Sequence, residues 1–98
     1  MTREAILDEA KKCVCSDRQN QYGSPEDSFS AIAHFWEDYL HAKGASVDID
    51  EKDVAAMMAL LKVARIATGH GKTDNWIDIA GYAACGGELE SRAKNRED

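Results

Sequence analysis

The segment Val54–Ala67 is apolar on nearly every side when it is drawn as a helix, and Lys62 and Arg65 are its only charged residues. Acidic residues in Asp48–Asp53 supply a cap and a first turn, and Gly69–Gly71 supply a stop. A helix that is apolar all round is normally surrounded by other helices. The segment therefore predicts a helical fold, and we expect it at the centre of the domain or of an oligomer.

Three other segments carry helical spacing or capping residues. One covers about Arg3–Cys15, and the next starts at Ser24–Asp27, where an N-cap precedes a proline at the first helical position, and ends near Gly44. The last starts at Thr73–Asp74 and gives way to a charged tail, Glu88–Asp98. No run of residues shows the alternation of apolar and polar side chains that is expected of a strand. The predicted fold class is all-α, a four-helix bundle-like domain completed by oligomerisation.

Two patterns predict how these helices pack. The second segment has residues at helical spacing that form an aromatic stripe facing the core: Phe29, Ile32, Ala33, Trp36, Tyr39 and Leu40. The last segment has a run of alanines and glycines between Ala80 and Gly87, which lets another backbone approach closely. We interpret that run as a tight helix contact, within the chain or between subunits.

Length, composition and charge narrow the class of protein. A chain of 98 residues with 44% hydrophobic residues suits one globular domain, and we expect an ordered core over about residues 3–90. The formal net charge of -6 argues against broad binding to a nucleic-acid backbone and leaves a small ligand as the expected partner. No stretch is apolar for the roughly 20 residues of a membrane span, and the N-terminus does not resemble a secretory signal, so we expect no membrane partner and a cytoplasmic location.

Two pairs of opposite charge depart from a plain helical bundle. Lys62 and Arg65 share one side of the apolar helix, and Asp74 and Asp78 share one side of the last helix. One interpretation is an ion-pair network between the two helices. The other is a phosphoryl-transfer site, in which the acids hold a divalent cation and the basic residues bind the phosphates that it bridges.

Three further residues are candidates for nucleotide binding. Arg18 and Tyr22 lie in a polar loop that could grip a nucleotide, or could simply connect two helices. Tyr82 follows Asp78 by one helical turn, so its ring is either a core residue or a surface on which a base stacks.

Three blocks carry a family resemblance. They are Arg18-Gln-x-x-Tyr22-Gly23 with Phe29 and Trp36, then Asp53-Val-Ala-x-Met57-Met58-x-Leu-Leu61-Lys62-x-x-Arg65, then Asp74-x-Trp76-x-Asp78-x-Ala-Gly81-Tyr82. In order and spacing they resemble a family of small phage and prophage proteins of unknown function, across about residues 5 to 90. That family is distantly similar to the all-α nucleoside-triphosphate pyrophosphohydrolases, the MazG-like group with dimeric dUTPases and phosphoribosyl-ATP pyrophosphatases.

The resemblance implies a specific chemistry. In the MazG-like enzymes an ExxE pair on one helix and an ExxD pair on a later helix hold Mg²⁺, and the enzyme hydrolyses a nucleotide to its monophosphate and pyrophosphate. The later pair would fall on Asn75 and Asp78, with Asp74 adjacent, and Glu51 and Asp53 near the start of the third helical segment could substitute as ligands. Asparagine lacks the carboxylate charge that a hard cation prefers, and no ExxE is present on the aromatic helix.

Three functions follow from these observations. The first is a phage pyrophosphohydrolase that acts on (deoxy)nucleoside triphosphates with Mg²⁺. In it Asp78 and Lys62 are catalytic, and the metal is bound by Asp74, Asp78 and Asp53. The nucleotide is bound by Arg18, Tyr22, Lys62, Arg65 and Tyr82. The second is an inactive phage nucleotide-binding protein that senses or sequesters host nucleotides or nucleotide signals. The third is a structural helical oligomer or protein-binding adaptor. We expect a homo-oligomer, a dimer or higher.

Overall fold

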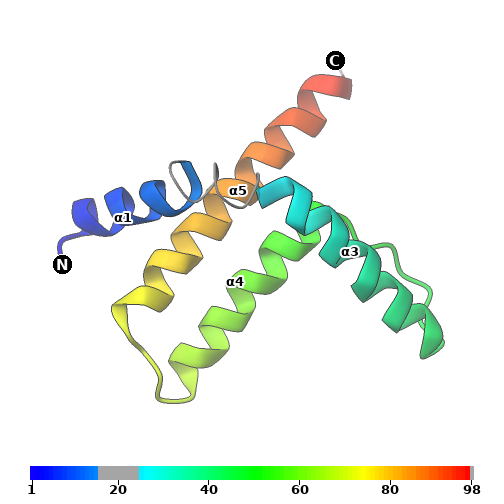
Figure 1. Ribbon diagram of the computed structural model, residues 1–98, viewed down its shortest axis with the longest axis horizontal. Helices are drawn as coiled ribbons and strands as arrows, with labels where there is room; N and C mark the ends of the chain where they lie inside the picture. The colour runs from blue at the N-terminus through cyan, green and yellow to red at the C-terminus, as the bar shows by residue number, and fades with distance from the viewer. Residues whose placement is uncertain (16–24, 98) are drawn as a thin grey trace.

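The chain folds into α-helices in the computed structural model, which describes residues 1–15 and 25–97, with side chains for 1–15 and 28–92. The helices are α1 (Arg3–Cys15), α3 (Pro25–Ala42), α4 (Glu51–Ala67) and α5 (Thr73–Glu97) (Figure 1). No strand occurs within the described ranges. The all-α prediction is therefore confirmed, with four helices packed together. Among these helices, none combines the length and hydropathy that a membrane span requires.

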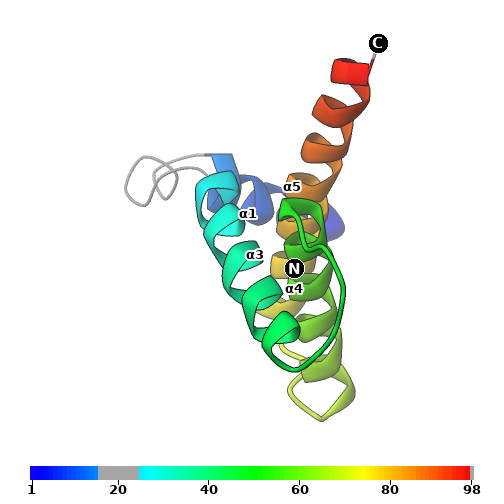
Figure 2. The same ribbon diagram turned by 90° about the vertical axis from the view of Figure 1, so that its right-hand side faces the viewer.

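The helices pack around a central antiparallel hairpin of α4 and α5. α1 packs against α5, and α3 packs against α4, so the helices lie in the order α1, α5, α4, α3. Figure 2 shows α3 alongside α4, while the last turns of α5 project beyond the other helices. The arrangement is an open row, and much of the central hairpin is not covered by other helices.

The core lies where α3, α4 and α5 meet. Val54 on α4 is fully buried at its centre, and the cluster comprises Phe29, Ala33, Val54, Ala55, Cys85 and Leu89. Cys85 is a free thiol within this cluster, consistent with a small packing residue. The core is small because each helix contributes only one or two turns to it.

One prediction about packing needs correction. Tyr39 was expected in the buried stripe of α3, yet it is exposed, because α4 covers the side of α3 that carries Phe29 and Ala33. α4 was expected at the centre of the domain or of an oligomer, and within one chain it leaves Leu60 and Leu61 exposed, among several large apolar side chains. One face of α4 contacts α3 and α5, and none of the described helices covers the other.

The charged tail is also helical, which corrects the expected end of the last helix near Glu88. α5 continues to Glu97 without a break. Leu89 is buried in the core, so this part of the helix is held by packing. Glu88 and Arg92, four residues apart, form an ion pair at 2.9 Å that favours the helix further. The paired glycines Gly86 and Gly87 lower helix propensity but do not end the helix.

Candidate functional site

The α4–α5 hairpin brings two of the predicted charged residues together. Lys62 Nζ lies 3.1 Å from Asp78 Oδ2, and both side chains are half-buried between the two helices. The hairpin is antiparallel, so residues near the end of α4 face residues near the start of α5. Lys62 and Asp78 therefore neutralise each other within one chain.

A second polar contact lies one helical turn nearer the loop. Arg65 Nε donates to Asn75 Oδ1 at 3.3 Å. The Asn75 side chain is buried, with 5% of its surface exposed, and its Nδ2 donates to the carbonyl oxygen of His70. The carboxamide accepts from Arg65 through its oxygen and donates to His70 through its nitrogen, which an ionised carboxylate at this position could not do. The resemblance aligns Asn75 with an acid of the MazG-like enzymes, and in this structure the Asn75 side chain has these two partners.

Local sequence fixes the geometry of this turn. Gly69 adopts a positive φ of 90°, which ends α4, and His70 N then donates to the carbonyl oxygen of Arg65 at 3.0 Å. Asn75 N donates to the carbonyl oxygen of Lys72 at 3.0 Å, at the start of α5. The side chain of Asn75 thus joins both ends of the turn and the Arg65 side chain.

Together these contacts form what we call the hairpin ladder, made of the pairs Lys62–Asp78 and Arg65–Asn75. Lys62 and Arg65 are three residues apart on α4, and Asn75 and Asp78 are three residues apart on α5. Equal spacing lets the pairs match when the helices run antiparallel. Asp74, the other predicted acid, is exposed in the first turn of α5.

We predict that Asn75→Ala lowers the free energy of unfolding by about 1–3 kcal/mol, because it removes the two hydrogen bonds that the buried Asn75 side chain makes to Arg65 and His70. The neighbouring substitution Asp74→Ala removes an exposed first-turn acid and should cost no more than about 1 kcal/mol. Urea denaturation of both variants measures the difference. Equal losses would mean that the ladder contact of Asn75 adds nothing to stability.

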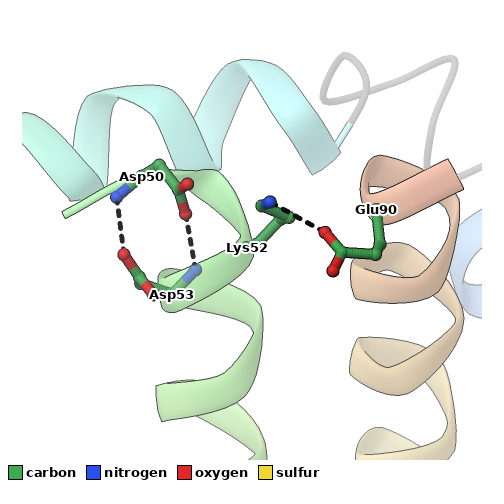
Figure 3. Close-up of polar contacts among 4 residues, drawn as sticks. All are labelled: Asp50, Lys52, Asp53 and Glu90. Carbon is green, nitrogen blue, oxygen red and sulfur yellow. Dashed lines mark hydrogen bonds and ion pairs between the residues drawn. The ribbon is translucent and has the colours of Figure 1, made fainter. Parts of the chain in front are cut away.

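Asp53, the third predicted metal ligand, lies at the opposite end of α4. Its Oδ2 accepts from Asp50 N at 3.0 Å, and its own N donates to Asp50 Oδ1 at 2.9 Å, a capping box that starts the helix (Figure 3). Nine residues separate it from Lys62, or about 13 Å along the helix axis. Asp53 is therefore not brought to Asp74 and Asp78 within one chain.

The carboxylates of the described residues do not fit a Mg²⁺ site built by one chain. Within residues 1–15 and 28–92, no three side chains of His, Cys, Asp or Glu are placed to share a metal ion. Mg²⁺ prefers carboxylate oxygens in octahedral geometry, and Asp78 is already engaged by the Lys62 ammonium. The predicted metal ligands Asp53, Asp74 and Asp78 are thus not gathered around one point within a single chain.

Tyr82 occupies a position between core and surface. Its ring centroid lies 6.2 Å from that of Phe29, with the planes tilted by 38°, and the residue is half-buried. It also lines an open groove between α4 and α5. The structure thus places one part of Tyr82 against the core while leaving another part accessible from the groove.

This groove has a volume of about 490 Å³ and is walled mainly by small residues. The lining comprises Lys52, Asp53, Ala55, Ala56, Ala59, Tyr82, Ala83, Gly86, Gly87 and Glu90. At its end, Lys52 Nζ lies 2.7 Å from Glu90 Oε2 (Figure 3), and this hydrogen bond raises the pKa of Lys52 above its ordinary value. The lining offers apolar surface, the neutralised Lys52–Glu90 ion pair and the Asp53 carboxylate, which accepts from Asp50 N in the capping box.

The remaining predicted residues are distributed as follows. Arg65 belongs to the hairpin ladder, and Tyr82 lies on the groove. Arg18 and Tyr22, predicted to bind a nucleotide, lie outside the described residues.

Comparison with known proteins gives one family and two phage relatives. The family model described as a domain of unknown function, DUF6378, matches residues 5–90. The chain is 39% identical to the Gene 55 protein of Mycobacterium phage D29 over 83 residues, which are 84% of this chain and 51% of that protein. It is 35% identical to the Gene 55 protein of Mycobacterium phage L5 over 79 residues, 81% of this chain and 48% of that protein.

These relatives are longer proteins. The chain spans about half the length of the curated relatives it matches. No solved structure matches the chain significantly.

Proposed function

From the premise that the chain belongs to the DUF6378 family and is homologous to mycobacteriophage Gene 55 proteins, we propose a nucleotide-binding protein related to the MazG-like pyrophosphohydrolases but without their hydrolysis. Its ligand is a nucleotide or a nucleotide-derived molecule, recognised through its phosphates. Binding needs no Mg²⁺ and leaves the ligand intact.

The hairpin ladder is the observation that carries this proposal. In the MazG-like enzymes, carboxylates on two helices hold the metal. The ExxE pair of those enzymes is missing from the aromatic helix α3, and the α4 residues that contact Asn75 and Asp78 are the cations Arg65 and Lys62, not acids. Lys62 supplies the charge that neutralises Asp78, and Asn75 is committed to Arg65 and His70. A hard cation would compete with an internal ammonium for a single carboxylate.

The same cations support phosphate recognition. Lys62 and Arg65 lie one helical turn apart, and the guanidinium of Arg65 is on an exposed residue that contacts Asn75 through Nε alone. A phosphate bound there would compete with Asp78 for Lys62 and would accept from the other nitrogens of Arg65. In a chain of net charge -6, such a local site favours a small anion over a long polyanion.

The first test is a thermal-shift screen against mono-, di- and triphosphates and cyclic nucleotides, with and without Mg²⁺, followed by chromatography of the samples. We expect one ligand class to stabilise the protein by about 2.7 kcal/mol at a hundred times its Kd, unchanged by Mg²⁺ and recovered intact. Release of pyrophosphate only with Mg²⁺ would establish the hydrolase instead. The absence of any stabilisation would overturn nucleotide binding.

We predict that Asp78→Asn tightens anion binding about five-fold, because removing a competing carboxylate from a partly exposed Lys62 contributes about 1 kcal/mol. A Mg²⁺-dependent hydrolase predicts the opposite, loss of turnover on losing its metal ligand. Asp74→Asn is the matched control, since it removes the same charge from an exposed position outside the ladder. Titration of each variant with the ligand found in the screen distinguishes the two models.

A further inference from the structure

One face of α4 is an uncovered apolar surface, which we call the α4 stripe. Its large residues are 40–64% exposed, and no charged residue lies among them. The stripe comprises Ala56, Met57, Leu60, Leu61, Val63, Ala64 and Ala67. These positions recur at helical spacing, so they form a continuous band along the helix, whose edge at Ala56 also lines the groove between α4 and α5.

The exposed area of the whole chain is also larger than that of a typical monomer. A globular monomer of this mass exposes about 5,500 Å², whereas this chain exposes 7170 Å². Its radius of gyration is 14.8 Å, against about 12.6 Å for a compact domain of this length. The total excess of about 1,600 Å² exceeds the roughly 800 Å² that each partner buries in a standard interface.

We propose that a second copy of this chain covers the stripe, with the two α4 helices packed antiparallel about a two-fold axis between Leu60 and Leu61. Around that axis Met57 faces Ala64 of the second copy, so a large side chain meets a small one. Leu60 faces Leu61 of the second copy. A two-fold interface of this kind is self-complementary and closed, so it covers both stripes without leaving a free end.

Charge selects the antiparallel orientation. The segment that begins α4 carries four acids, Asp48, Asp50, Glu51 and Asp53, and one base, Lys52, which is paired with Glu90. The end of α4 and the following turn carry the bases Arg65 and Lys72. Antiparallel packing sets the acidic end of each helix beside the basic end of the other, and also opposes the helix dipoles. Parallel packing would bring the two acidic ends together.

The test is the mass of the native protein in solution, measured by light scattering during size-exclusion chromatography. We expect the full chain to have twice the monomer mass of 10.8 kDa, and Leu60→Glu to have the monomer mass. The substitution places a carboxylate near the axis on both copies, so the dissociation constant should rise at least about a hundred-fold.

The matched control is Leu7→Glu. Leu7 on α1 is 62% exposed and Leu60 is 64% exposed, so a single chain should tolerate both substitutions equally. A monomeric wild-type chain, or an oligomer that Leu60→Glu leaves intact, would overturn the proposal. If Leu60→Glu fails to fold by circular dichroism, a Leu60→Cys variant with Cys15→Ser gives an independent answer. It should form a disulfide-linked dimer on oxidation, and a failure to do so would contradict an axis beside Leu60.

Discussion

Replacing Phe29 by alanine is expected to lower the free energy of unfolding by about 3–5 kcal/mol, a large part of the stability of a domain of this size. Phe29 is 6% exposed and lies in the core cluster with Val54, and its ring also contacts Tyr82. Truncation removes apolar burial and leaves a cavity among α3, α4 and α5 that the small neighbouring residues cannot fill. Chemical denaturation monitored by circular dichroism measures the loss.

Phe35 provides the matched control on the same helix. It is 73% exposed, so Phe35→Ala should change stability by no more than about 0.5 kcal/mol while making the same change in helix propensity. Equal losses at both positions would mean that Phe35 is covered in the native assembly, or that α3 does not pack as described.

The two phenylalanines also show how far sequence reasoning reaches. Helical spacing correctly indicated Phe29, Ala33 and Trp36 as one face, because the period of a helix is fixed by its backbone. The same spacing included Tyr39, which is exposed. How much of a stripe is covered depends on the position of the neighbouring helix, and no local pattern in α3 specifies that position.

The hairpin ladder was predictable only in part. Opposite charges on the two helices indicated a contact between Lys62 and Asp78, and the structure brings them together. Asp74 was expected to be the second acid facing Lys62 and Arg65, because it carries a charge, whereas the structure has Asn75 in contact with Arg65. The equal spacing of Lys62–Arg65 and Asn75–Asp78 was a usable signal, but the bond from Asn75 to His70 depends on the course of the turn.

The ends of the helices were also predictable only in part. The glycine stop after α4 was predictable, because Gly69 has a positive φ that other residues rarely adopt. The extension of α5 to Glu97 was not, since the charged composition after Glu88 resembled a solvated tail. Burial of Leu89 is a tertiary effect, and it keeps this part of the helix against the core.

Gly81 and Gly87, six residues apart on α5, should respond in opposite directions to the same substitution. A Cβ atom on Gly81 would lie 3.3 Å from Val14 Cγ1 of α1, whereas a Cβ atom on Gly87 would meet nothing within 4 Å. We predict that Gly81→Leu lowers the free energy of unfolding by about 2 kcal/mol by overpacking the α1–α5 contact. Gly87→Leu should raise it by up to about 1 kcal/mol through helix propensity.

A second substitution identifies the cause of the loss at Gly81. Val14→Ala removes the atom that the new side chain would meet, so in the Gly81→Leu background it should restore stability, although alone it should destabilise. Urea denaturation of the four proteins in this cycle gives the coupling energy between the two positions. Additive effects, or a loss at Gly87 equal to that at Gly81, would show that α1 does not pack closely against Gly81. The small-residue run would then have to serve a contact between subunits, as the sequence also allowed.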